Sequence, residues 1–466
     1  IYRLMKKFDI AILGGGPGGY VAAIRGAQLG KKVCIIEKDK LGGICLNWGC
    51  IPTKALLKNA EVLNQIKSAD IYGINIKSFS IDFKKNIMRS RDVANRLNKG
   101  IEFLMKKNKI SQLSGVGKLL SRNELKVTNN QNTEIIEAEN IIIATGARPR
   151  AFPGMELDGK RIISSKNAMT LDNAPKNMVI IGSGAIGCEF AYYYNTFGTK
   201  VHILELANRV LPIEDTDISK ELEKSFINKG IKISTSTKVL KVESSETKVQ
   251  IFFEKDNIQS SIESDVALLA IGVTGNIEGI GLNNIGVETS QGKIDINKNT
   301  QTNIPNIYAI GDVSGPPWLA HRASAQAHIA IGHILGQKIK PIDSSKIPSC
   351  TYCQPQVASI GLTELQAKDA GYNIKIGRSS FQSSGKALAL GDPEGFVKLI
   401  FDKKYGELIG AHIIGNEATE LIAELGIAKE LESTIEDLAF SIHAHPTLSE
   451  SIMEAALDAL GSPIHH

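Results

Sequence analysis

This sequence has few cysteines, no long apolar run and little excess of charge of one sign. Its 466 residues include six cysteines. That is too few for the disulfide framework of a secreted scaffold, and it favours a reducing compartment such as the cytoplasm. No apolar run reaches the roughly 18 residues of a transmembrane helix, so we expect no membrane span. The 54 basic and 49 acidic residues leave a net charge of only +5, which gives no reason to expect nucleic acid or a membrane surface as a partner.

The composition that remains is typical of a globular protein. Hydrophobic residues make up 42% and charged residues 22% of the chain, which excludes a disordered or fibrous protein. At about 150 residues per domain, the length predicts about three domains. The N-terminal residues lack the features of a signal peptide, and we expect Met5 to be the natural start, with residues 1–4 added before it.

A strand, glycine turn, helix and strand are predicted twice in the same order. The two copies occupy residues 8–13, 14–19, 20–29 and 32–37, and then 178–181, 182–187, 188–197 and 200–205. Six residues recur with a constant separation of 168: Gly14, Gly16, Gly19, Gly30, Val33 and Glu37 correspond to Gly182, Gly184, Gly187, Gly198, Val201 and Glu205. The duplication predicts two βαβ dinucleotide-binding units in two domains.

The glycines of the first turn suit a bound dinucleotide. Gly14 permits the turn, Gly16 lets the backbone approach a pyrophosphate, and Gly19 allows the helix to pack closely on the strand. Glu37 closes the next strand, where it can accept hydrogen bonds from a ribose. A lone glycine motif often marks a turn without a ligand. Here the strand, the helix, the acidic residue and the duplication together favour a cofactor site.

The second turn repeats this pattern with Gly182, Gly184 and Gly187, and Glu205 there distinguishes between nucleotides. A carboxylate repels a 2′-phosphate by on the order of 1–4 kcal/mol at about 4 Å, whereas a free 2′-hydroxyl donates a hydrogen bond to it. The second unit is therefore predicted to bind NAD rather than NADP. Arg209, four residues further on, is interpreted as a solvated side chain.

Cys45 and Cys50 flank a short loop just after the first unit. Pro52 is suited to start the following helix. A cysteine before a helix N-terminus lies at the positive end of the dipole, which lowers its pKa and favours the thiolate. The flanking glycines let the loop bring the two sulfurs together. Spacing alone is equally compatible with two buried, reduced cysteines. A zinc site shared with Cys350 and Cys353 is a further alternative, and it requires two distant loops to converge.

The position of this cysteine pair favours a redox role. A dithiol beside the first cofactor can exchange electrons only if that cofactor reacts with thiolates; flavins do, whereas nicotinamide carries hydride and needs an intermediary. The simplest arrangement places FAD in the first unit and NAD in the second. Cys34 and Cys188 fall inside a predicted strand and a predicted helix, so we interpret them as packing residues. Cys350 and Cys353 are either a second redox centre or, as we favour, packing residues.

The segment from Gly42 through Cys45 and Cys50 to Lys54 resembles the redox signature of the class I flavoprotein disulfide reductases. The likeness runs from Phe8 to about Pro463. It includes Ala144, Thr145 and Gly146 at a predicted strand end, and a segment that ends in Gly311 and Asp312. Within that family the chain is similar to the members that oxidise dihydrolipoamide on the lipoyl domains of 2-oxoacid dehydrogenase complexes.

The resemblance implies roles for individual residues. Cys45 and Cys50 would form the redox disulfide, Asp312 would bind the ribityl chain of the flavin, and Lys54 and Glu189 would pair near flavin N5. It implies no metal ligand. The remaining positions that it assigns to cofactor binding are Ala144, Thr145, Gly146, Gly272, Gly311 and Ala320.

A His-Pro-Thr segment precedes the last predicted helix. Taken alone, Thr447 and Glu450 fit a helix capping box, and His445 fits an ordinary loop residue. The segment also resembles the family's His-Pro-Thr signature, which implies that His445 is the thiol base and Glu450 its orienting partner, with His443 a lesser candidate. In the family this histidine acts on the disulfide of the other subunit, which implies an obligate homodimer.

The predicted fold class is α/β, with two Rossmann-like dinucleotide-binding domains and a C-terminal α+β dimerisation domain. We expect an FAD domain at 1–150, an NAD domain at 151–273, a central segment at 274–345 that completes the FAD domain, and an interface domain at 346–466. Residues 147–154 are expected to be an irregular linker, and 337–348 a polar boundary. The predicted reaction passes electrons from dihydrolipoamide through Cys45–Cys50 and FAD to NAD⁺, a role in cell redox homeostasis.

Four rival functions are each disfavoured by a specific residue pattern. Glutathione reductase, the nearest alternative, would need basic residues in place of Glu205. Mercuric reductase would add a C-terminal cysteine pair, a soluble transhydrogenase would lack Cys45 and Cys50, and a scaffold subunit without turnover would not need complete motifs. Two departures from the family are Ile44, where threonine is common, and residues 321–327, which lack the usual acidic residue and glycine. We expect these to alter the flavin environment rather than activity.

Overall fold

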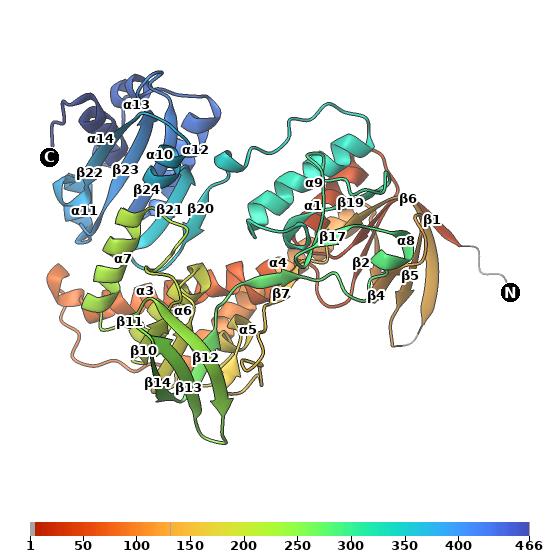
Figure 1. Ribbon diagram of the computed structural model, residues 1–466, viewed down its shortest axis with the longest axis horizontal. Coiled ribbons are helices and arrows are strands. Elements are labelled where there is room, and N and C mark those ends of the chain that lie inside the picture. The colour runs from red at the N-terminus through yellow and green to blue at the C-terminus, as the bar shows by residue number, and fades with distance from the viewer. Residues whose placement is uncertain (1–4, 131, 466) are drawn as a thin grey trace. The chain divides into compact units, whose positions relative to one another are not determined.

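The computed structural model describes residues 5–130 and 132–465, and the chain divides into two compact units (Figure 1). Residues 1–4, which would precede the expected start at Met5, lie outside the described part. The first unit combines the N-terminal segment up to Ala55 with Lys85–Arg150 and Gly272–Ile342. The second combines Leu56–Lys84, Ala151–Ile271 and the segment from Asp343 onward.

The first unit is built on a seven-stranded sheet with the order β3-β2-β1-β6-β5-β4, in which β19 also pairs with β6. Five of the strands are parallel: β1 (Lys6–Leu13), β2 (Val33–Glu37), β3 (Ser111–Ser114), β6 (Thr133–Ile143) and β19 (Ile307–Ala309). β4 (Val116–Leu119) and β5 (Glu124–Thr128) are antiparallel. This is a Rossmann-like fold, as predicted, and β4 and β5 extend it as an antiparallel ribbon.

Both faces of this sheet are covered, which explains why β1 is continuously apolar from Ile10 to Leu13. Ile10 and Ile12 belong to a core shared with helices α1 (Pro17–Gln28) and α9 (Ala320–Ile334). Ala11 and Leu13, on the alternate positions, belong to a second core that includes residues of β5. The remaining elements of this unit are α2 (Gly43–Trp48), most of α4 (Phe83–Lys107), β7 (Ala147–Pro149), β16 (Val273–Gly275), α8 (Leu282–Ile285), β17 (Thr289–Ser290), β18 (Lys293–Ile294) and η2 (Gly311–Ser314).

The second unit contains another Rossmann-like sheet, fully parallel, with the order β11-β10-β9-β15-β8. A three-stranded antiparallel sheet covers one face, where Val242 and Ile251 pack against Val179 and Ile181. The strands and helices are β8 (Ile162–Ile163), α5 (Ser165–Ala168), β9 (Asn177–Ile181), α6 (Ala185–Thr196), β10 (Lys200–Leu204), α7 (Thr216–Asn228), β11 (Lys232–Ser234), β12 (Thr237–Ser244), β13 (Val249–Lys255), β14 (Ile258–Ser264) and β15 (Val266–Leu269).

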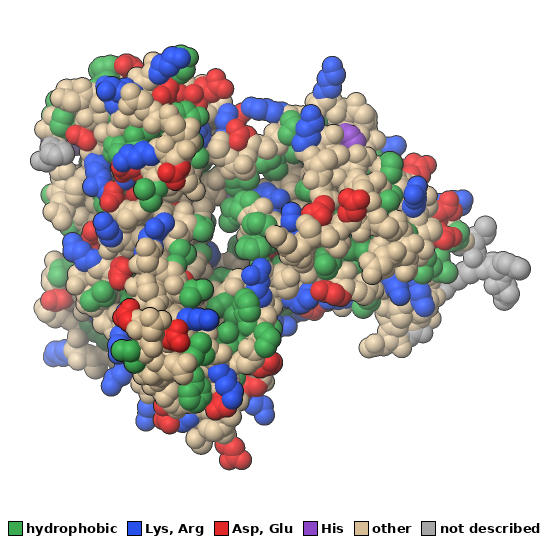
Figure 2. Space-filling view, viewed as in Figure 1, with side chains coloured by type: hydrophobic (Ala, Val, Ile, Leu, Met, Phe, Trp, Pro, Cys, Tyr) green, Lys and Arg blue, Asp and Glu red, His purple; other side chains and the backbone are tan. Residues whose placement is uncertain are grey.

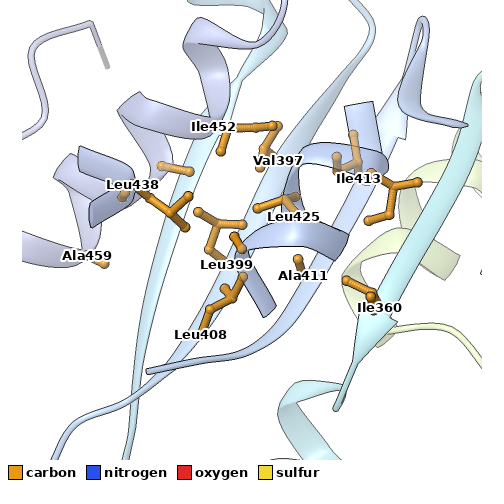
Figure 3. Packing of buried hydrophobic residues seen from close by; sticks show 14 of the residues in the cluster. Ile360, Val397, Leu399, Leu408, Ala411, Ile413, Leu425, Leu438, Ile452 and Ala459 are labelled. Carbon is orange, nitrogen blue, oxygen red and sulfur yellow. The ribbon is translucent and has the colours of Figure 1, made fainter. Parts of the chain in front are cut away.

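The C-terminal part of the second unit is an α+β domain with an antiparallel sheet of order β20-β21-β24-β23-β22. Figure 3 shows its core, in which Leu399, Leu408 and Ala411 of the sheet meet Leu425, Leu438 and Ile452 of the helices. Its elements are η3 (Ser344–Lys346), β20 (Ser349–Thr351), β21 (Gln356–Gly361), α10 (Glu364–Asp369), β22 (Ile374–Ser380), η4 (Phe381–Ser383), α11 (Gly385–Leu390), β23 (Gly395–Asp402), β24 (Leu408–Gly415), α12 (Ala418–Glu430), α13 (Ile435–Phe440) and α14 (Glu450–Leu460).

The structure corrects two local predictions. The expected linker is regular at its start, because β7 pairs antiparallel with β16 through Ala147 and Gly275. The cysteine segment is helical rather than a loop: Cys45 lies in α2, and α3 (Cys50–Lys67) begins at Cys50, two residues before the predicted start at Pro52. η1 (Ala69–Tyr72) follows α3.

The surface composition agrees with the low net charge, and the helices agree with the short apolar runs. On the face shown in Figure 2, acidic and basic side chains are interspersed. Across residues 5–130 and 132–465, no helix combines the length and the hydropathy needed to cross a membrane.

Candidate active site

The first glycine turn connects β1 to α1 through positions that exclude side chains. Gly14 has φ +109°, and a Cβ there would lie 2.2 Å from the carbonyl oxygen of Ala144. A Cβ on Gly19 would lie 1.9 Å from the carbonyl oxygen of Gly14, so α1 packs directly on the turn. Gly16 differs, because a Cβ there would meet nothing within 4 Å. The turn is closed on its inner side and open at Gly16, where a pyrophosphate would approach.

Glu37 holds this turn with both carboxylate oxygens. Oε2 accepts the Gly15 N–H at 2.7 Å, and Oε1 accepts the Asp39 N–H at 2.9 Å. The side chain therefore fixes the backbone of the glycine turn as well as closing β2. Each carboxylate oxygen can accept a further hydrogen bond, which leaves Glu37 able to accept from a ribose hydroxyl.

The second turn repeats the same geometry in the other unit. Gly182 has φ +99° and faces the carbonyl oxygen of Ala270, and a Cβ on Gly187 would lie 2.1 Å from the carbonyl oxygen of Gly182. Gly184 is open, like Gly16. Glu205, which is buried, accepts from the Ser183 N–H and hydroxyl with Oε2, both at 2.7 Å, and from the Ala207 N–H with Oε1.

Both turns fit a dinucleotide phosphate. Gly16 and Gly184 are the N-caps of α1 and α6, each with extended backbone angles and without a side-chain capping hydrogen bond. The N–H groups at these two helix ends thus remain available, and the positive end of each helix dipole faces the open side of its turn. The residues present suit the pyrophosphate of one dinucleotide in each unit.

Two loops of the first unit lie at the carboxyl ends of β6 and β19. Ala144 and Thr145 follow β6, and the Thr145 hydroxyl donates to the carbonyl oxygen of Asn276 at 2.8 Å. Gly311 and Asp312 begin η2 after β19. Burial raises the pKa of the Asp312 carboxyl, against the opposing positive charge of Arg322. Both loops flank the first glycine turn, because Ala144 contacts Gly14 and a carbon on Gly18 would touch Ile310.

Gln326 on α9 anchors the Asp312 loop, and no sequence motif identifies it. Its Oε1 accepts the Gly311 N–H at 2.7 Å, its Nε2 donates to the Ser314 hydroxyl at 3.3 Å, and the residue is 3% exposed. It lies in the segment where the family's acidic residue is lacking. A buried neutral amide thus positions the loop without adding a negative charge. Ala320, a predicted cofactor contact, is the first residue of the same helix.

Cys45 and Cys50 are brought together by the break between α2 and α3. Both are half-buried free thiols, and their side chains are hydrogen-bonded to each other. The hydrogen bond to Cys50 is the main cause that raises the pKa of Cys45, and burial adds to it, while the charge of Lys54 opposes it. Cys50 stands at the first residue of α3, where the positive end of the helix dipole favours a thiolate.

The cysteine helix is held by residues that no motif identified. The Asn47 amide donates to the carbonyl oxygens of Leu41 at 2.9 Å and Gly43 at 3.0 Å. Arg91 on α4 donates to the Asn47 carbonyl at 2.7 Å and lies 4.9 Å from the centre of the Trp48 ring. Burial lowers the pKa of Arg91. An arginine in an amphipathic helix carries no sequence signal for such a role.

His445 and Glu450 form a hydrogen-bonded pair in the C-terminal domain. His445 Nδ1 lies 2.9 Å from Glu450 Oε1, and the His445 side chain is 80% exposed. The other oxygen of Glu450 accepts the Thr447 N–H at 2.8 Å. The Thr447 hydroxyl donates to the Ala444 carbonyl instead of capping the helix, whose N-cap is Ser449. Half of the predicted capping box is therefore wrong: Glu450 binds the Thr447 N–H, but the Thr447 hydroxyl does not cap the helix. Glu450 also holds the histidine.

Hydrogen bonds keep Glu450 ionised. The Thr447 N–H and the His445 ring lower the pKa of its carboxyl, and the charges of His445 and His443 add to this. The anion fixes His445 with Nδ1 as the donor, so Nε2 is the nitrogen left to accept a proton. The arrangement is that of a general base and its orienting carboxylate.

The other predicted site residues occupy separate positions. Glu189 lies in α6, one turn after its N-terminus, and is buried; its Oε1 accepts the Tyr352 N–H at 3.1 Å. Lys54 is half-buried on α3, one turn after Cys50. Their pairing stays a prediction. Gly272 has φ +97°, and its carbonyl accepts the Arg150 N–H at 3.0 Å; its contact with a nucleotide likewise stays a prediction.

The other cysteines lie in environments that favour packing. The Cys188 thiol donates to the Ser183 carbonyl at 3.2 Å, and the Cys353 thiol donates to the Pro355 carbonyl at 3.3 Å. Burial raises the pKa of Cys188 well above its usual value and that of Cys34 to about 12. Cys350 is half-buried in β20. Within the part of the chain that the structure describes, no group of three or more His, Cys, Asp or Glu side chains is placed to hold a metal ion.

Comparison with known proteins gives consistent matches over nearly the whole chain. A relative from Chlorobaculum tepidum named dihydrolipoyl dehydrogenase is 46% identical over 461 residues, covering 98% of each chain. One of the same name from Bacillus subtilis is 43% identical over 473 residues, covering 99% of this chain and all of the relative. Among solved structures, LpdA from Mycobacterium tuberculosis superposes with a TM-score of 0.91 at 27% identity, covering 97% of this chain and 99% of LpdA.

A more distant structural match is the HOCl-induced flavoprotein disulfide reductase RclA from Escherichia coli, with a TM-score of 0.85 at 26% identity, covering 96% of this chain and 99% of RclA. The family model described as pyridine nucleotide-disulphide oxidoreductase matches residues 8–327, and the model of its dimerisation domain matches residues 347–456. These matches confirm the resemblance inferred from the redox signature: the chain belongs to the pyridine nucleotide-disulphide oxidoreductase family.

Proposed function

We propose that this protein is a dihydrolipoyl dehydrogenase that oxidises protein-bound dihydrolipoamide and passes the electrons to NAD⁺. The observation that carries the proposal is the hydrogen-bonded Cys45–Cys50 pair, in the same unit as the glycine turn that suits FAD. The relatives named dihydrolipoyl dehydrogenase support the choice of substrate. Bound FAD would accept two electrons from a dithiol and deliver them as hydride to a nicotinamide.

The side chains of this protein would supply the thiol chemistry. His445 Nε2 takes the proton from one thiol of dihydrolipoamide, and the resulting thiolate attacks Cys45 Sγ of the oxidised pair. The Cys45–Cys50 bond breaks, Cys50 leaves as the thiolate, and a mixed disulfide links Cys45 to the substrate. The second substrate thiol, as thiolate, displaces Cys45, so lipoamide leaves as a disulfide and both cysteines are reduced. Glu450 keeps the imidazole oriented throughout.

Glu205 supports NAD over NADP as the acceptor. Its carboxylate is buried beside the second glycine turn and already fixes the backbone of Ser183. A 2′-phosphate at the ribose would meet this negative charge, whereas a 2′-hydroxyl would donate to it. The same residue argues against glutathione reductase, the alternative function, which would need cations there.

We infer a homodimer and a 2-oxoacid dehydrogenase complex as the setting of this reaction. The match of residues 347–456 to a dimerisation domain supports the dimer. In that dimer, His445 of one subunit would serve the cysteine pair of the other. The lipoyl domains of the complex would deliver the dihydrolipoamide.

The test is NADH formation by the purified protein supplied with dihydrolipoamide and NAD⁺. Wild type should reduce NAD⁺, and Cys45→Ser should not. NADP⁺ in place of NAD⁺ should give a much slower reaction. Turnover with reduced glutathione and NADP⁺, but none with dihydrolipoamide, would reject the proposal.

A further inference from the structure

A second histidine–glutamate pair lies next to the first, and its hydrogen bonds define its charge. His443 Nδ1 is 2.9 Å from the carbonyl oxygen of Ser441, and its Nε2 is 2.7 Å from Glu424 Oε1 on α12. The His443 side chain is only 7% exposed, and that of Glu424 is 35% exposed. Unlike His445, this imidazole is enclosed and has a partner at each nitrogen.

The partners of His443 are both acceptors. A backbone carbonyl can only accept, so Nδ1 must carry a hydrogen. An ionised carboxylate also only accepts, so Nε2 must carry a hydrogen as well. With both nitrogens donating, the ring is an imidazolium. The neutral alternative requires a proton on Glu424, and this is disfavoured because the carboxyl is partly exposed to water, which solvates its charge.

His445 has the opposite pattern, although it lies only two residues away. Its Nδ1 faces Glu450, and among the described residues its Nε2 has no hydrogen-bond partner. The Nε2 of His445 is therefore open to a proton, whereas both nitrogens of His443 are occupied as donors. The charge of His443 also reaches Glu450, where it contributes to keeping that carboxyl ionised.

We propose that His443, fixed as an imidazolium by Ser441 and Glu424, is a positioning residue for the His445–Glu450 pair. It anchors the segment that carries His445 to α12, and its charge faces the Glu450 carboxylate on α14. This inference rests on the proposed function, because it assigns His445 as the thiol base. The charged and titratable groups around it are Glu424 on α12, Glu450 on α14 and His445 on the same segment; Asp437 on α13 is bound to Thr434 at the other end of its helix.

The charge of His443 has a defined effect on the base. A nearby cation disfavours protonation of His445, so it keeps the base neutral to lower pH. His443→Gln removes the cation and leaves Glu424 ionised. The acidic limb of the pH profile of kcat/KM for dihydrolipoamide should then move to higher pH, by roughly 0.5 unit. Glu424→Gln lets His443 keep both hydrogen bonds as a neutral ring, because the new amide donates to Nε2. Glu424→Gln should shift the acidic limb in the same direction by a smaller amount.

His465→Gln is the matched control. His465 Nδ1 lies 2.9 Å from Glu454 Oε1, so it forms another histidine–glutamate pair on α14, one turn beyond Glu450. Its removal should leave the acidic limb in place. A merely structural role of His443 would lower kcat/KM without moving the limb in either variant. That result, or a shift to lower pH, would overturn the proposal.

The protonation of His443 can be measured without turnover. In deuterated protein labelled with ¹³C at histidine Cε1, the resonance missing from His443→Gln is that of His443. It should have the chemical shift of an imidazolium at about pH 7. A neutral ring at about pH 7 would overturn the proposal. If the wild type did not oxidise dihydrolipoamide, the proposed function would fail, whereas this spectrum would still decide the charge of His443.

Discussion

Glu450 binds His445 and Thr447 at the same time, one with each carboxylate oxygen. Oε1 lies 2.9 Å from His445 Nδ1, and Oε2 accepts the Thr447 N–H at 2.8 Å. The side chain that ties down the chain before α14 is therefore also the one that orients the imidazole. Binding the chain before the helix and orienting the imidazole are not alternatives here, because the carboxylate has an oxygen for each.

Replacing Glu450 with glutamine should separate these two roles. The amide oxygen of Glu450→Gln can still accept the Thr447 N–H, but the charge that orients and stabilises a protonated His445 is lost. We expect kcat/KM for dihydrolipoamide to fall about 100-fold, the lower end of general-base effects. Reduction of bound FAD by NADH, which needs no thiol base, should be unchanged. An equal loss in both assays would contradict the assigned role.

Glu450 should also make the stability of the fold sensitive to acid. Its pKa is lower in the folded protein than in the unfolded chain, so its stabilising effect is present above the unfolded pKa and disappears as pH falls through the folded pKa. The free energy of unfolding in urea should therefore fall more steeply towards acidic pH for wild type than for Glu450→Gln. Parallel curves for the two proteins would show that the carboxylate makes no such contribution.

The two cysteines should differ in their spectra. Because the pKa of Cys45 is raised and Cys50 begins α3, where the helix dipole favours a thiolate, we expect Cys45→Ser to leave a thiolate at Cys50. With FAD bound, we expect this variant to show long-wavelength absorbance without any reductant, whereas Cys50→Ser should show none. Both should lose more than about 99.9% of dihydrolipoamide oxidation, since the nucleophile or its leaving group is missing.

Cys350→Ser is the matched control for these variants. If Cys350 and Cys353 are packing residues, it should retain turnover and the spectrum of wild type. Loss of turnover with intact FAD binding would show instead that this pair is a second redox centre.

Nucleotide preference should respond to the charge of Glu205. Glu205→Gln keeps a side-chain oxygen for the Ser183 N–H but removes the negative charge beside the ribose. If the repulsion is about 1.4 kcal/mol, the ratio of kcat/KM for NAD⁺ over NADP⁺ should fall about 10-fold. Stopped-flow reduction of NAD⁺ and NADP⁺ by the prereduced protein measures this ratio. An unchanged ratio would exclude the carboxylate as the determinant.

The parts of the site that the sequence predicted are those in which backbone geometry demands one residue type. Gly14 and Gly182 need positive φ, and Gly19 and Gly187 leave no room for a side chain. The glycine pattern alone was therefore enough to predict the two turns. The helix at Cys45 was not predicted, because it depends on the Asn47 amide, which binds the Leu41 carbonyl, and on Arg91, which binds the Asn47 carbonyl from α4. Likewise, polar side chains such as Gln326 and His443 acquire their roles from partners far along the chain.

Gln326 illustrates a role that can be tested through cofactor affinity. Gln326→Leu removes the acceptor of the buried Gly311 N–H and leaves that donor unpaired. An unpaired buried donor costs about 1–3 kcal/mol, and the Asp312 loop would shift to recover a partner. We expect FAD to bind roughly 10-fold more weakly, as measured by fluorescence recovery on titration of the apoprotein. Gln326→Glu keeps the acceptor and should bind FAD more tightly than Gln326→Leu; equal affinities would contradict the anchoring role.

The ion cluster around Lys398 connects the nucleotide-binding part of the second unit to its C-terminal domain. Lys398 on β23 is 1% exposed, and its Nζ lies 2.9 Å from Asp215 Oδ1, 2.7 Å from Asp217 Oδ2 and 2.7 Å from Glu364 Oε2. Burial raises the pKa of Asp215, but hydrogen bonds from Lys398 and from two backbone N–H groups hold it below its usual value. Asp215 is 2% exposed, so without the lysine its charge would be buried and unpaired.

Lys398→Met should therefore destabilise the fold strongly. Removing one partner of a buried ion pair costs about 3–5 kcal/mol, which we expect as a reduction of the free energy of unfolding in urea at a fixed protein concentration. Lys368→Met is the control, because Lys368 also binds Glu364, at 2.6 Å, but is 55% exposed; its loss should cost under about 1 kcal/mol. The destabilisation by Lys398→Met should shrink as pH falls and Asp215 is protonated, since a neutral carboxyl needs no cation. A pH-independent loss would mean that the methionine is destabilising through packing and not through the unpaired charge.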